Sequence, residues 1–187
     1  TQPLHLLVET MLRYLQVAFL LVLFNAPLSA ATFTDAMGRQ VVLDEPPRRI
    51  VSLVPSVTEI LFALGAQDLL VAVTDACTYP EAATFLPNVG QYADPSLEQI
   101  LLQRPDLVFA AADMNRPEQV KRLESLNIPV FVVYPNKVQE TLETIRAIGQ
   151  VTGHAAAAEQ LIDDFSRRLL HIEQQLEQRP RVSALVC

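Results

Sequence analysis

The sequence predicts an α/β fold: a Rossmann-like, mostly parallel sheet lobe, then a long spine helix that leads to a truncated second α/β lobe. Two observations predict it. Short apolar runs alternate with amphipathic segments over residues 31–153, which is typical of a parallel sheet with helices on both faces. One uninterrupted helical pattern then fills residues 154–179, and another apolar run begins in residues 180–187. We therefore expect an N-terminal lobe, an inter-lobe helix and the first strand of a C-terminal lobe.

Residues 11–30 have the layout of a secretory signal peptide. Arg13 precedes an apolar core, and the small residues LSAA follow that core. The core is shorter than the roughly 20 residues of a comfortable membrane span, although an uncleaved anchor is the alternative. We expect residues 1–10 to be an upstream extension, cleavage to follow Ala30 or Ala31, and the mature chain to be exported to the periplasm.

Charge and cysteine content exclude two classes of protein. The net charge is −7, whereas a nucleic-acid-binding protein needs a basic face. The chain carries only Cys77 and Cys187, too few for the disulfide framework of a small secreted scaffold. We expect no nucleic-acid partner, and at most one disulfide bridge.

The first elements of the lobe are a hairpin and a strand-and-helix pair. Residues 32–43 alternate around a glycine and predict a small β-hairpin. The apolar run IVSLVP, at 50–55, predicts a buried strand. Ser56 and Glu59 then have the spacing of a capping box, so we expect a helix that starts there and stops at Gly65.

Three further strand-and-helix pairs follow. Their strands are predicted at 69–74, 106–111 and 128–135, and their helices at 94–103, 115–126 and 136–153. Asp94 is the expected cap of the first of these helices, and Asn115 with Glu118 the expected cap pair of the second.

The last two helices carry one apolar face each. In the helix at 136–153 the face consists of Val138, Leu142, Ile145, Ile148 and Val151. In the spine helix it consists of Leu161, Phe165, Leu169, Ile172 and Leu176. The length of the second helix and its place before another apolar run suggest two lobes joined by a stiff spine.

The motifs of several enzyme classes are missing. The five glycines form neither a dinucleotide-binding nor a phosphate-binding loop, and there is no serine-hydrolase elbow or HExxH zinc motif. After residue 30 the histidines are His154 and His171, both on the spine helix, so Cys77 has no general base on a neighbouring loop. We expect no catalytic residue, no metal site and no cofactor.

The expected ligand site is the set of loops that leave the carboxyl ends of the strands. These loops read PSVTE, TDACTYP, AADMN and YPNK. Their basic groups are limited to Arg116 and Lys137, close to the last two loops. Ferric siderophores and haem propionates are anionic and favour arginine or lysine, whereas aromatic and neutral polar groups suit a bulky, nearly neutral ligand.

Four segments together resemble one family: PRRIVSLVPSVTEILFALG, VAVTDACTYPEAATFLPNVG, DPSLEQILLQRPDLVFA and LESLNIPVFVVYP. They are similar to the N-terminal lobe of periplasmic substrate-binding proteins of ABC importers, in the rigid-helix class that carries cobalamin and iron complexes. The resemblance runs from about Arg48 to Gln178. It implies a monomeric, non-enzymatic protein of two α/β lobes, with one long helix between them and the ligand held in the cleft.

Within this class, SLVPSVTEILFALG and the tract TDACTYP resemble the cobalamin branch most closely. The resemblance therefore implies capture of a corrinoid, cobalamin, for delivery to an ABC importer permease in the membrane. Haem or a ferric siderophore on the same fold is the alternative, with Tyr79, Tyr92 or Tyr134 available as an axial haem ligand. A periplasmic sensor domain or an α/β enzyme of unknown chemistry is the more distant alternative.

The resemblance and the loops together predict six ligand-binding residues: Ser56, Cys77, Tyr79, Tyr92, Met114 and Asn115. Four of them have a structural alternative. Ser56 and Asn115 could serve only as helix caps, and Cys77 as a small buried residue at a strand end. The ring of Tyr79 could pack on the lobe instead of lining the cleft.

Glu118 is the expected docking residue for the permease. In the family a surface glutamate on each lobe pairs with arginines of the permease, and Glu118 falls within a residue of that place. Pro117 interrupts the match there, and Glu124 is the other candidate. The structural alternative for Glu118 is a cap pair with Asn115.

Overall fold

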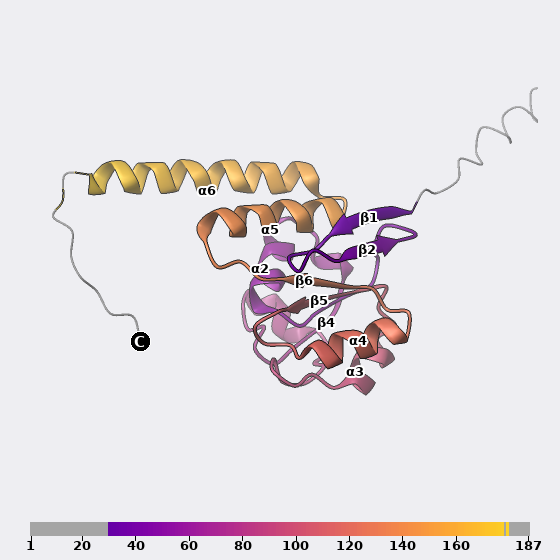
Figure 1. Cartoon of the computed structure of the whole chain (residues 1–187). Helices are drawn as coiled ribbons and strands as arrows, with labels where there is room; N and C mark the ends of the chain where they lie inside the picture. The colour runs from indigo at the N-terminus through magenta and orange to yellow at the C-terminus, as the bar shows by residue number, and fades with distance from the viewer. Residues whose placement is uncertain (1–29, 178, 180–187) are drawn as a thin grey trace, which may run out of the picture. The chain divides into compact units, whose positions relative to one another are not determined.

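The computed structural model describes residues 30–177 and 179, and its elements follow the predicted order (Figure 1). The strands are β1 (Ala31–Thr34), β2 (Gln40–Leu43), β3 (Ile50–Ser52), β4 (Leu70–Val73), β5 (Leu107–Ala111) and β6 (Val130–Val133). The helices are α2 (Pro55–Ala63), α3 (Leu97–Leu102), α4 (Pro117–Ser125), α5 (Val138–Val151) and α6 (Ala155–Leu176). Two 3-10 helices, η1 (Gln67–Leu69) and η2 (Glu81–Phe85), lie on either side of β4 in the chain. The predicted upstream extension, the signal peptide before Ala30 and the strand at 180–187 fall outside the described residues.

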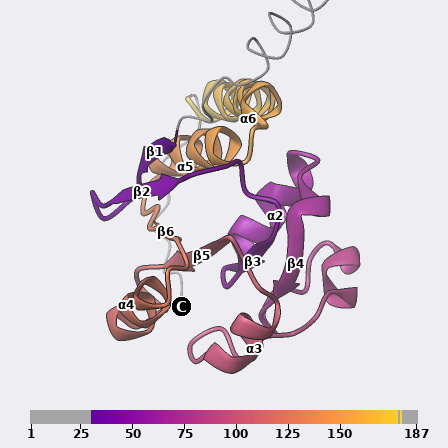
Figure 2. The same cartoon turned by 90° about the vertical axis from the view of Figure 1, so that its right-hand side faces the viewer.

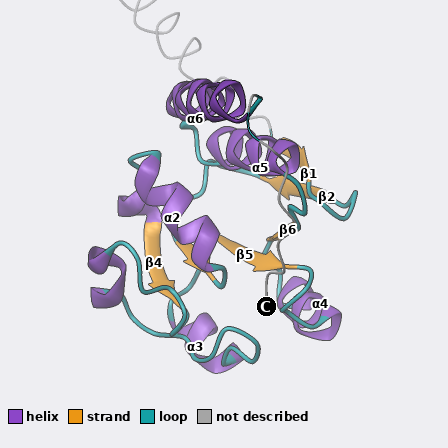
Figure 3. Ribbon diagram, turned by 90° about the vertical axis from the view of Figure 1, so that its left-hand side faces the viewer, coloured by secondary structure: helices purple, strands orange, loops and turns teal. Residues whose placement is uncertain are grey.

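Four strands form one parallel sheet in the order β4-β3-β5-β6, and β1 and β2 form the predicted antiparallel hairpin. Helices α2 and α5 lie on one face of the parallel sheet, and α3 and α4 on the other (Figure 2, Figure 3). Every residue of β3, β5 and β6 is buried, as expected for strands covered on both faces. The prediction of an α/β fold built on a parallel sheet is confirmed.

Both edges of the sheet are covered by loops. At β6, Ala36 donates its amide to the carbonyl of Val132 at 3.0 Å, and the Asp35 carboxylate accepts from the amide of Val132 at 3.3 Å. At β4, the amide of Val73 donates to the carbonyl of Pro87 at 3.0 Å, and the carbonyl of Val73 accepts from the amide of Val89 at 2.9 Å. An open strand edge is a template for pairing with another chain, so these bonds protect the lobe from association through its sheet.

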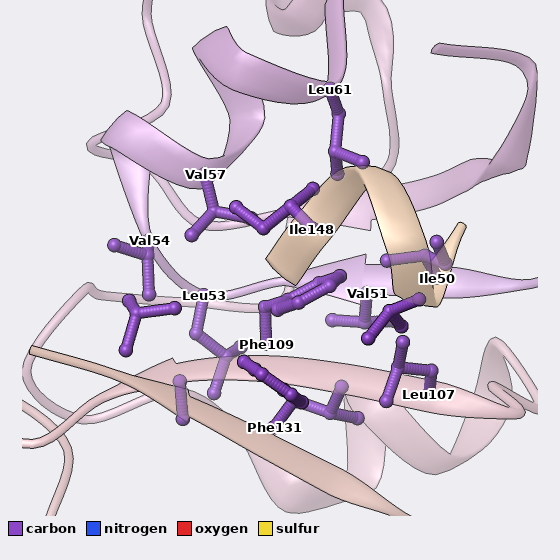
Figure 4. Packing of buried hydrophobic residues seen from close by; sticks show 14 of the residues in the cluster. Ile50, Val51, Leu53, Val54, Val57, Leu61, Leu107, Phe109, Phe131 and Ile148 are labelled. Atoms are coloured by element: carbon purple, nitrogen blue, oxygen red, sulfur yellow. The ribbon is translucent and has the colours of Figure 1, made fainter. Parts of the chain in front are cut away.

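The core covers both faces of the parallel sheet, with buried side chains from α2 and α5 on one face and from α3 and α4 on the other. Phe109, in β5, is fully buried, and its ring lies edge-on to that of Phe131 with the ring centroids 5.7 Å apart. Val57 of α2 and Ile148 of α5 point toward this pair (Figure 4). Burial of side chains of this size contributes about 1.5–3 kcal/mol each, so the core holds the strands and their loops in register.

The end of α2 was predicted correctly, but its start was not. The helix begins at Pro55, and Ser56 is its second residue rather than its cap. Proline is favoured at the first helical position because its fixed φ suits the helix and its missing N–H would be unpaired there. At the other end Gly65 has a φ of +73°, which a residue with a side chain adopts at a cost, and its amide bonds to the carbonyl of Phe62 at 3.1 Å.

The predicted caps of α3 and α4 are also wrong. Ser96, not Asp94, caps α3, and its hydroxyl accepts from the amide of Gln99 at 3.3 Å. Helix α4 begins after Arg116, whose amide donates to the side-chain oxygen of Gln119 at 3.2 Å. The pair of Asn115 and Glu118 therefore does not cap α4.

Helices α5 and α6 pack against each other along their adjoining turns. Of the predicted α5 face, Leu142, Ile145, Ile148 and Val151 are buried, whereas Val138 is exposed at the helix start. A bidentate ion pair joins Arg146 of α5 to Glu159 of α6, at 2.6 and 3.0 Å.

Helix α6 buries only its first half. Ala158 and Ile162 are buried, but Phe165, Ile172 and Leu176 of the predicted apolar stripe are 41%, 50% and 53% exposed. The stripe exists as predicted, yet nothing in the described part of the chain covers its distal end. Among the described residues no helix has the length and the apolar run needed to cross a membrane.

Candidate ligand-binding site

The carboxyl ends of the four parallel strands share one edge of the sheet. The loops that follow β4, β5 and β6, residues 74–80, 112–116 and 134–137, meet there with the start of α2. The segment 88–96 joins them, because Asp75 donates its amide to the carbonyl of Gly90 at 3.0 Å. We call this surface the carboxyl edge; it is the edge at which open parallel sheets bind ligands.

The backbone of Tyr92 is held by two other loops of the carboxyl edge. Its amide donates to the carboxylate of Asp75 at 3.1 Å, and its carbonyl accepts from the side-chain amide of Asn115 at 3.0 Å. The two partners belong to the loops after β4 and after β5. The backbone of Tyr92 is therefore fixed between two neighbouring strand ends.

The side chain of Tyr92 is partly buried. Burial raises the pKa of its phenol above the ordinary value, and the electrostatic effect of Asp113, then of Cys77, raises it further. The phenol is consequently neutral at physiological pH and can donate a hydrogen bond. An aromatic face with a polar tip of this kind can contact a flat or amide-rich ligand.

Three other predicted residues present their side chains to solvent. Tyr79 is 69% exposed and Met114 is 38% exposed, on the loops after β4 and β5 respectively. Ser56 is exposed in the first turn of α2. These exposures leave all three free to contact a ligand at the carboxyl edge.

Cys77 lies in the core, where the structural alternative placed it. Its side chain is 2% exposed, and its sulfur accepts a hydrogen bond from the hydroxyl of Thr58 at 3.2 Å. The hydroxyl of Thr74 lies 3.4 Å away on another side. The tract TDACTYP therefore divides, with Thr74 and Cys77 facing inward and Tyr79 facing outward. The thiol is not part of the surface that a ligand could touch.

Asn115 is likewise buried, at 3% exposure, although it was predicted to contact a ligand or cap a helix. Its side-chain oxygen accepts from the amide of Ala111 at 2.8 Å, and its nitrogen donates to Tyr92. Both atoms of the amide are thus engaged within the lobe. The structure assigns Asn115 to the support of the carboxyl edge rather than to its surface.

Two supporting residues were not predicted. Asp75 holds the amide of Tyr92, and Gln119 donates its side-chain nitrogen to the carboxylate of Asp94 at 2.9 Å. Asp75 directly follows the apolar run at 69–74 that predicts a strand, which is a usual place for a functional carboxylate, so this signal was available in the sequence. Gln119 carries no such signal because its partner lies 25 residues away.

Glu118 is exposed in the first turn of α4, and no ion pair to it is found within residues 30–177. Glu124, the other candidate, is paired with Arg39 at 2.7 Å. Glu118 is therefore the freer of the two carboxylates. Across the described part of the chain, no three His, Cys, Asp or Glu side chains cluster as a metal site would require.

Comparison with known proteins gives the family. The model of the periplasmic binding protein family matches residues 50–187. A vitamin B12-binding protein of Vibrio cholerae serotype O1 is 30% identical over 148 residues, covering 79% of this chain and 54% of the relative. The chain spans about half the length of the curated relatives that it matches.

Solved structures agree. The periplasmic vitamin B12 binding protein BtuF of Vibrio cholerae has a TM-score of 0.67 and 29% identity, covering 73% of this chain and 54% of its own. A periplasmic heme binding protein from Pseudomonas aeruginosa has a TM-score of 0.66 and 27% identity, covering 72% and 50%. These relatives bind substrates and are not enzymes, as the missing catalytic motifs predicted. The chain belongs to the periplasmic binding protein family.

Proposed function

We propose that this chain is the N-terminal lobe and spine helix of an exported periplasmic protein that captures cobalamin and delivers it to an ABC importer. The chemistry of the carboxyl edge carries the proposal. Tyr79, Tyr92 and Met114 offer two aromatic rings and a thioether, and residues 74–80 and 88–96 contain no basic side chain. Cobalamin is bulky, nearly neutral and fringed with amides, so it suits aromatic faces and neutral hydrogen-bonding groups.

The relatives favour the same ligand. The curated relatives described above carry the name vitamin B12-binding protein, at 29–32% identity. At this level of identity a shared fold is secure, whereas the ligand depends on the loops and has to be argued from them. The small number of basic side chains at the carboxyl edge, limited to Arg116 and Lys137, supplies that argument.

The exposed half of α6 supports a two-lobe protein. Phe165, Ile172 and Leu176 present a continuous apolar stripe over the last three turns of the helix. A stripe of this length on a solvent-exposed helix is unfavourable unless another part of the protein covers it. We propose that a second α/β lobe, of the kind that the longer relatives have room for, packs there and closes a cleft over the carboxyl edge. The protein would act as a monomer, with the ligand between its two lobes.

Isothermal titration calorimetry of the two-lobe protein, free of its signal segment, tests the ligand. Cobalamin, hemin and a ferric siderophore are titrated in parallel, and we expect saturable one-to-one binding of cobalamin. Tyr79→Ala and Tyr92→Ala should each raise the Kd by on the order of tenfold, the value of one good aromatic contact. Leu102→Ala removes an equally exposed apolar side chain at the opposite edge of the sheet and should leave the Kd unchanged. No binding of cobalamin would refute the proposal.

Residues 31–187 alone supply a further test. They hold only one wall of the proposed cleft, so they should bind cobalamin weakly or not at all. Binding with a Kd in the micromolar range or below, by this part alone, would contradict the two-lobe arrangement.

Haem is the second candidate because a heme-binding protein matches this lobe as well as a vitamin B12-binding protein does, with TM-scores of 0.66 and 0.67. The exposed phenol of Tyr79 could serve as an axial ligand. Phenylalanine separates the two functions: Tyr79→Phe keeps an aromatic contact to cobalamin but removes the oxygen that would ligate iron. Loss of hemin binding in Tyr79→Phe, with no binding of cobalamin by the parent protein, would favour haem.

Glu118 is the proposed contact with the importer. Its carboxylate is exposed and could pair with arginines of a permease, an interaction that steers association. Glu118→Gln should lower cobalamin uptake by cells that depend on this protein, without changing the Kd for cobalamin. Glu124→Gln, which neutralises a neighbouring glutamate already paired with Arg39, is the matched control and should leave uptake unchanged. Equal uptake in the parent and in Glu118→Gln would exclude this residue from docking.

A further inference from the structure

The side chain of Asn115 closes the end of strand β5. The neighbouring strand β3 ends at Ser52, which pairs with Phe109. The amide of Ala111, two residues farther along β5, therefore has no partner within β3. The side-chain oxygen of Asn115 accepts from this amide at 2.8 Å, and the backbone amide of Asn115 returns a bond to the carbonyl of Ala111 at 2.9 Å. Asn115 thereby satisfies the buried amide of Ala111 and supplies the shorter of the two bonds to its carbonyl, since the amide of Met114 also donates there at 3.4 Å.

The nitrogen of the same side chain reaches a different loop. It donates to the carbonyl of Tyr92 at 3.0 Å, 23 residues earlier in the chain. The amide of Tyr92 is held from the opposite side by Asp75 at 3.1 Å. Two residues farther along, the Asp94 carboxylate accepts from Gln119 of α4 at 2.9 Å. The segment around Tyr92 is therefore tied to the ends of both β4 and β5.

We infer that Asn115 is a positioning residue for the ligand site: it holds the backbone of Tyr92, together with Asp75, so that the ring is already in its binding position before the ligand arrives. The inference rests on the proposed function, in which Tyr92 contacts the ligand. Asn115 itself touches no ligand, since it is 3% exposed and both atoms of its amide are engaged.

Preorganisation gives this arrangement its effect on affinity. A loop that samples several positions must lose that freedom when the ligand binds, and the loss reduces the affinity. Removal of one of the two bonds to the Tyr92 peptide should raise the Kd by on the order of tenfold. The change should be mainly a faster dissociation, as for most changes within a preformed binding surface.

Two substitutions cut the two bonds separately. Asn115→Asp keeps the oxygen that accepts from Ala111 but replaces the donor that faces the carbonyl of Tyr92. Asp75→Ala removes the acceptor for the amide of Tyr92 at an exposed position, so it leaves no buried group without a partner in its own place. Asp75→Asn retains an acceptor oxygen, so it should restore the affinity that Asp75→Ala loses.

Hydrogen exchange of the ligand-free protein tests the bonds themselves. The amides of residues 89–94 should exchange faster in Asn115→Asp and in Asp75→Ala than in the parent, because the segment opens more often. The exchange should slow again in Asp75→Asn. Unchanged exchange in both Asn115→Asp and Asp75→Ala would overturn the inference, since the segment would then be held by other contacts.

Binding measured in a Tyr92→Ala background separates positioning from general support of the fold. Once the ring is absent, its position no longer matters, so Asn115→Asp should cause no further loss of affinity for cobalamin. An equal loss in both backgrounds would show that Asn115 acts on the lobe as a whole, and would overturn the inference. So would an unchanged affinity in Tyr92→Ala alone. A parent protein that binds neither cobalamin, hemin nor a ferric siderophore would refute the proposed function instead, and the exchange data would still report on the bonds to Tyr92.

Discussion

Gly149 is the glycine that sets how closely α5 and α6 approach. It is the only one of the five glycines without a positive φ, so its backbone conformation does not call for glycine. A Cβ atom there would lie 2.4 Å from the Cβ of Ala158, 3.2 Å from the carbonyl of His154 and 3.4 Å from the Cα of Ala155. Ordinary carbon–carbon contacts are about 3.5–4.0 Å. The residue is glycine because the next helix begins directly against it.

We predict that Gly149→Ala lowers the free energy of unfolding by about 1–2 kcal/mol. Two opposing effects give this value. Alanine gains about 1 kcal/mol over glycine within a helix, whereas an added methyl in a packed interior costs about 1–3 kcal/mol. The added methyl would contact the backbone of His154 and Ala155 as well as the side chain of Ala158. A small shift of Ala158 alone would therefore not relieve the clash. The cost should therefore fall in the upper part of its range and exceed the gain.

A double-mutant cycle with Ala158→Gly tests the contact. Ala158→Gly alone should cost about 2 kcal/mol, from lost helix propensity and one lost buried methyl. The double variant moves the methyl from α6 to α5. Its free energy of unfolding should lie within about 1 kcal/mol of that of the parent, so its loss of stability should be much smaller than the sum of the two single losses. Urea unfolding followed by circular dichroism measures all four proteins. A Gly149→Ala variant that is as stable as the parent or more stable, with additive effects in the cycle, would refute this packing.

Three further predictions concern other parts of the lobe. Asp35→Ala should lower the free energy of unfolding by about 3 kcal/mol, because its buried carboxylate accepts from three backbone amides and the Arg39 guanidinium. In the same urea assay Glu124→Gln, which removes the exposed partner of that arginine, should cost less than about 1 kcal/mol, and equal losses would contradict the assignment. Gly65→Ala should lower stability by about 1 kcal/mol through its φ of +73° alone, since no atom lies within 4 Å of the added methyl; an unchanged melting temperature would argue against this. The raised pKa of Tyr92 means that the stability it contributes is complete below the ordinary tyrosine pKa of 10.0 and is lost as the pH rises through the folded-state value. A titration of tyrosinate absorbance should show one late-ionising group that is missing in Tyr92→Phe, and an identical curve for both proteins would refute the raised pKa.

The order of strands and helices could be predicted from the sequence because it depends on periodicity within single segments. The continuous apolar runs of β3, β5 and β6 and the apolar face of α5 are local patterns of this kind. Helix starts were predicted less well. Ser56 and Glu59 have capping-box spacing, but Pro55 begins the helix one residue earlier, and the pattern of serine and glutamate does not exclude that. Asp94 is a good cap by residue type, but so is Ser96 two residues later, and residue type alone does not place the start of α3.

The candidate site was predictable only in part. Its place at the carboxyl ends of the strands follows from the parallel sheet, and the exposure of Tyr79 and Met114 agrees with a role on that surface. The burial of Asn115 was not predicted, and that of Cys77 was only one of two alternatives, because burial here depends on partners that are distant in the sequence. The sulfur of Cys77 meets a hydroxyl 19 residues away, and the amide of Asn115 meets a carbonyl 23 residues away. Residues close to a strand end can face either way, and only the fold decides which.

The contacts of this lobe concentrate rigidity at two places that bear on ligand capture. At the carboxyl edge, Asp75 and Asn115 hold the backbone of Tyr92 from two sides. Between α5 and α6, Gly149 lies close to Ala158, and Arg146 forms an ion pair with Glu159. These contacts set the direction in which α6 leaves the lobe. If α6 joins two lobes as proposed, a large hinge motion would have to break this packing, which buried helix contacts resist. Discrimination between cobalamin and haem would then depend on the exposed side chains of the carboxyl edge, Tyr79 among them, rather than on how far the lobes close.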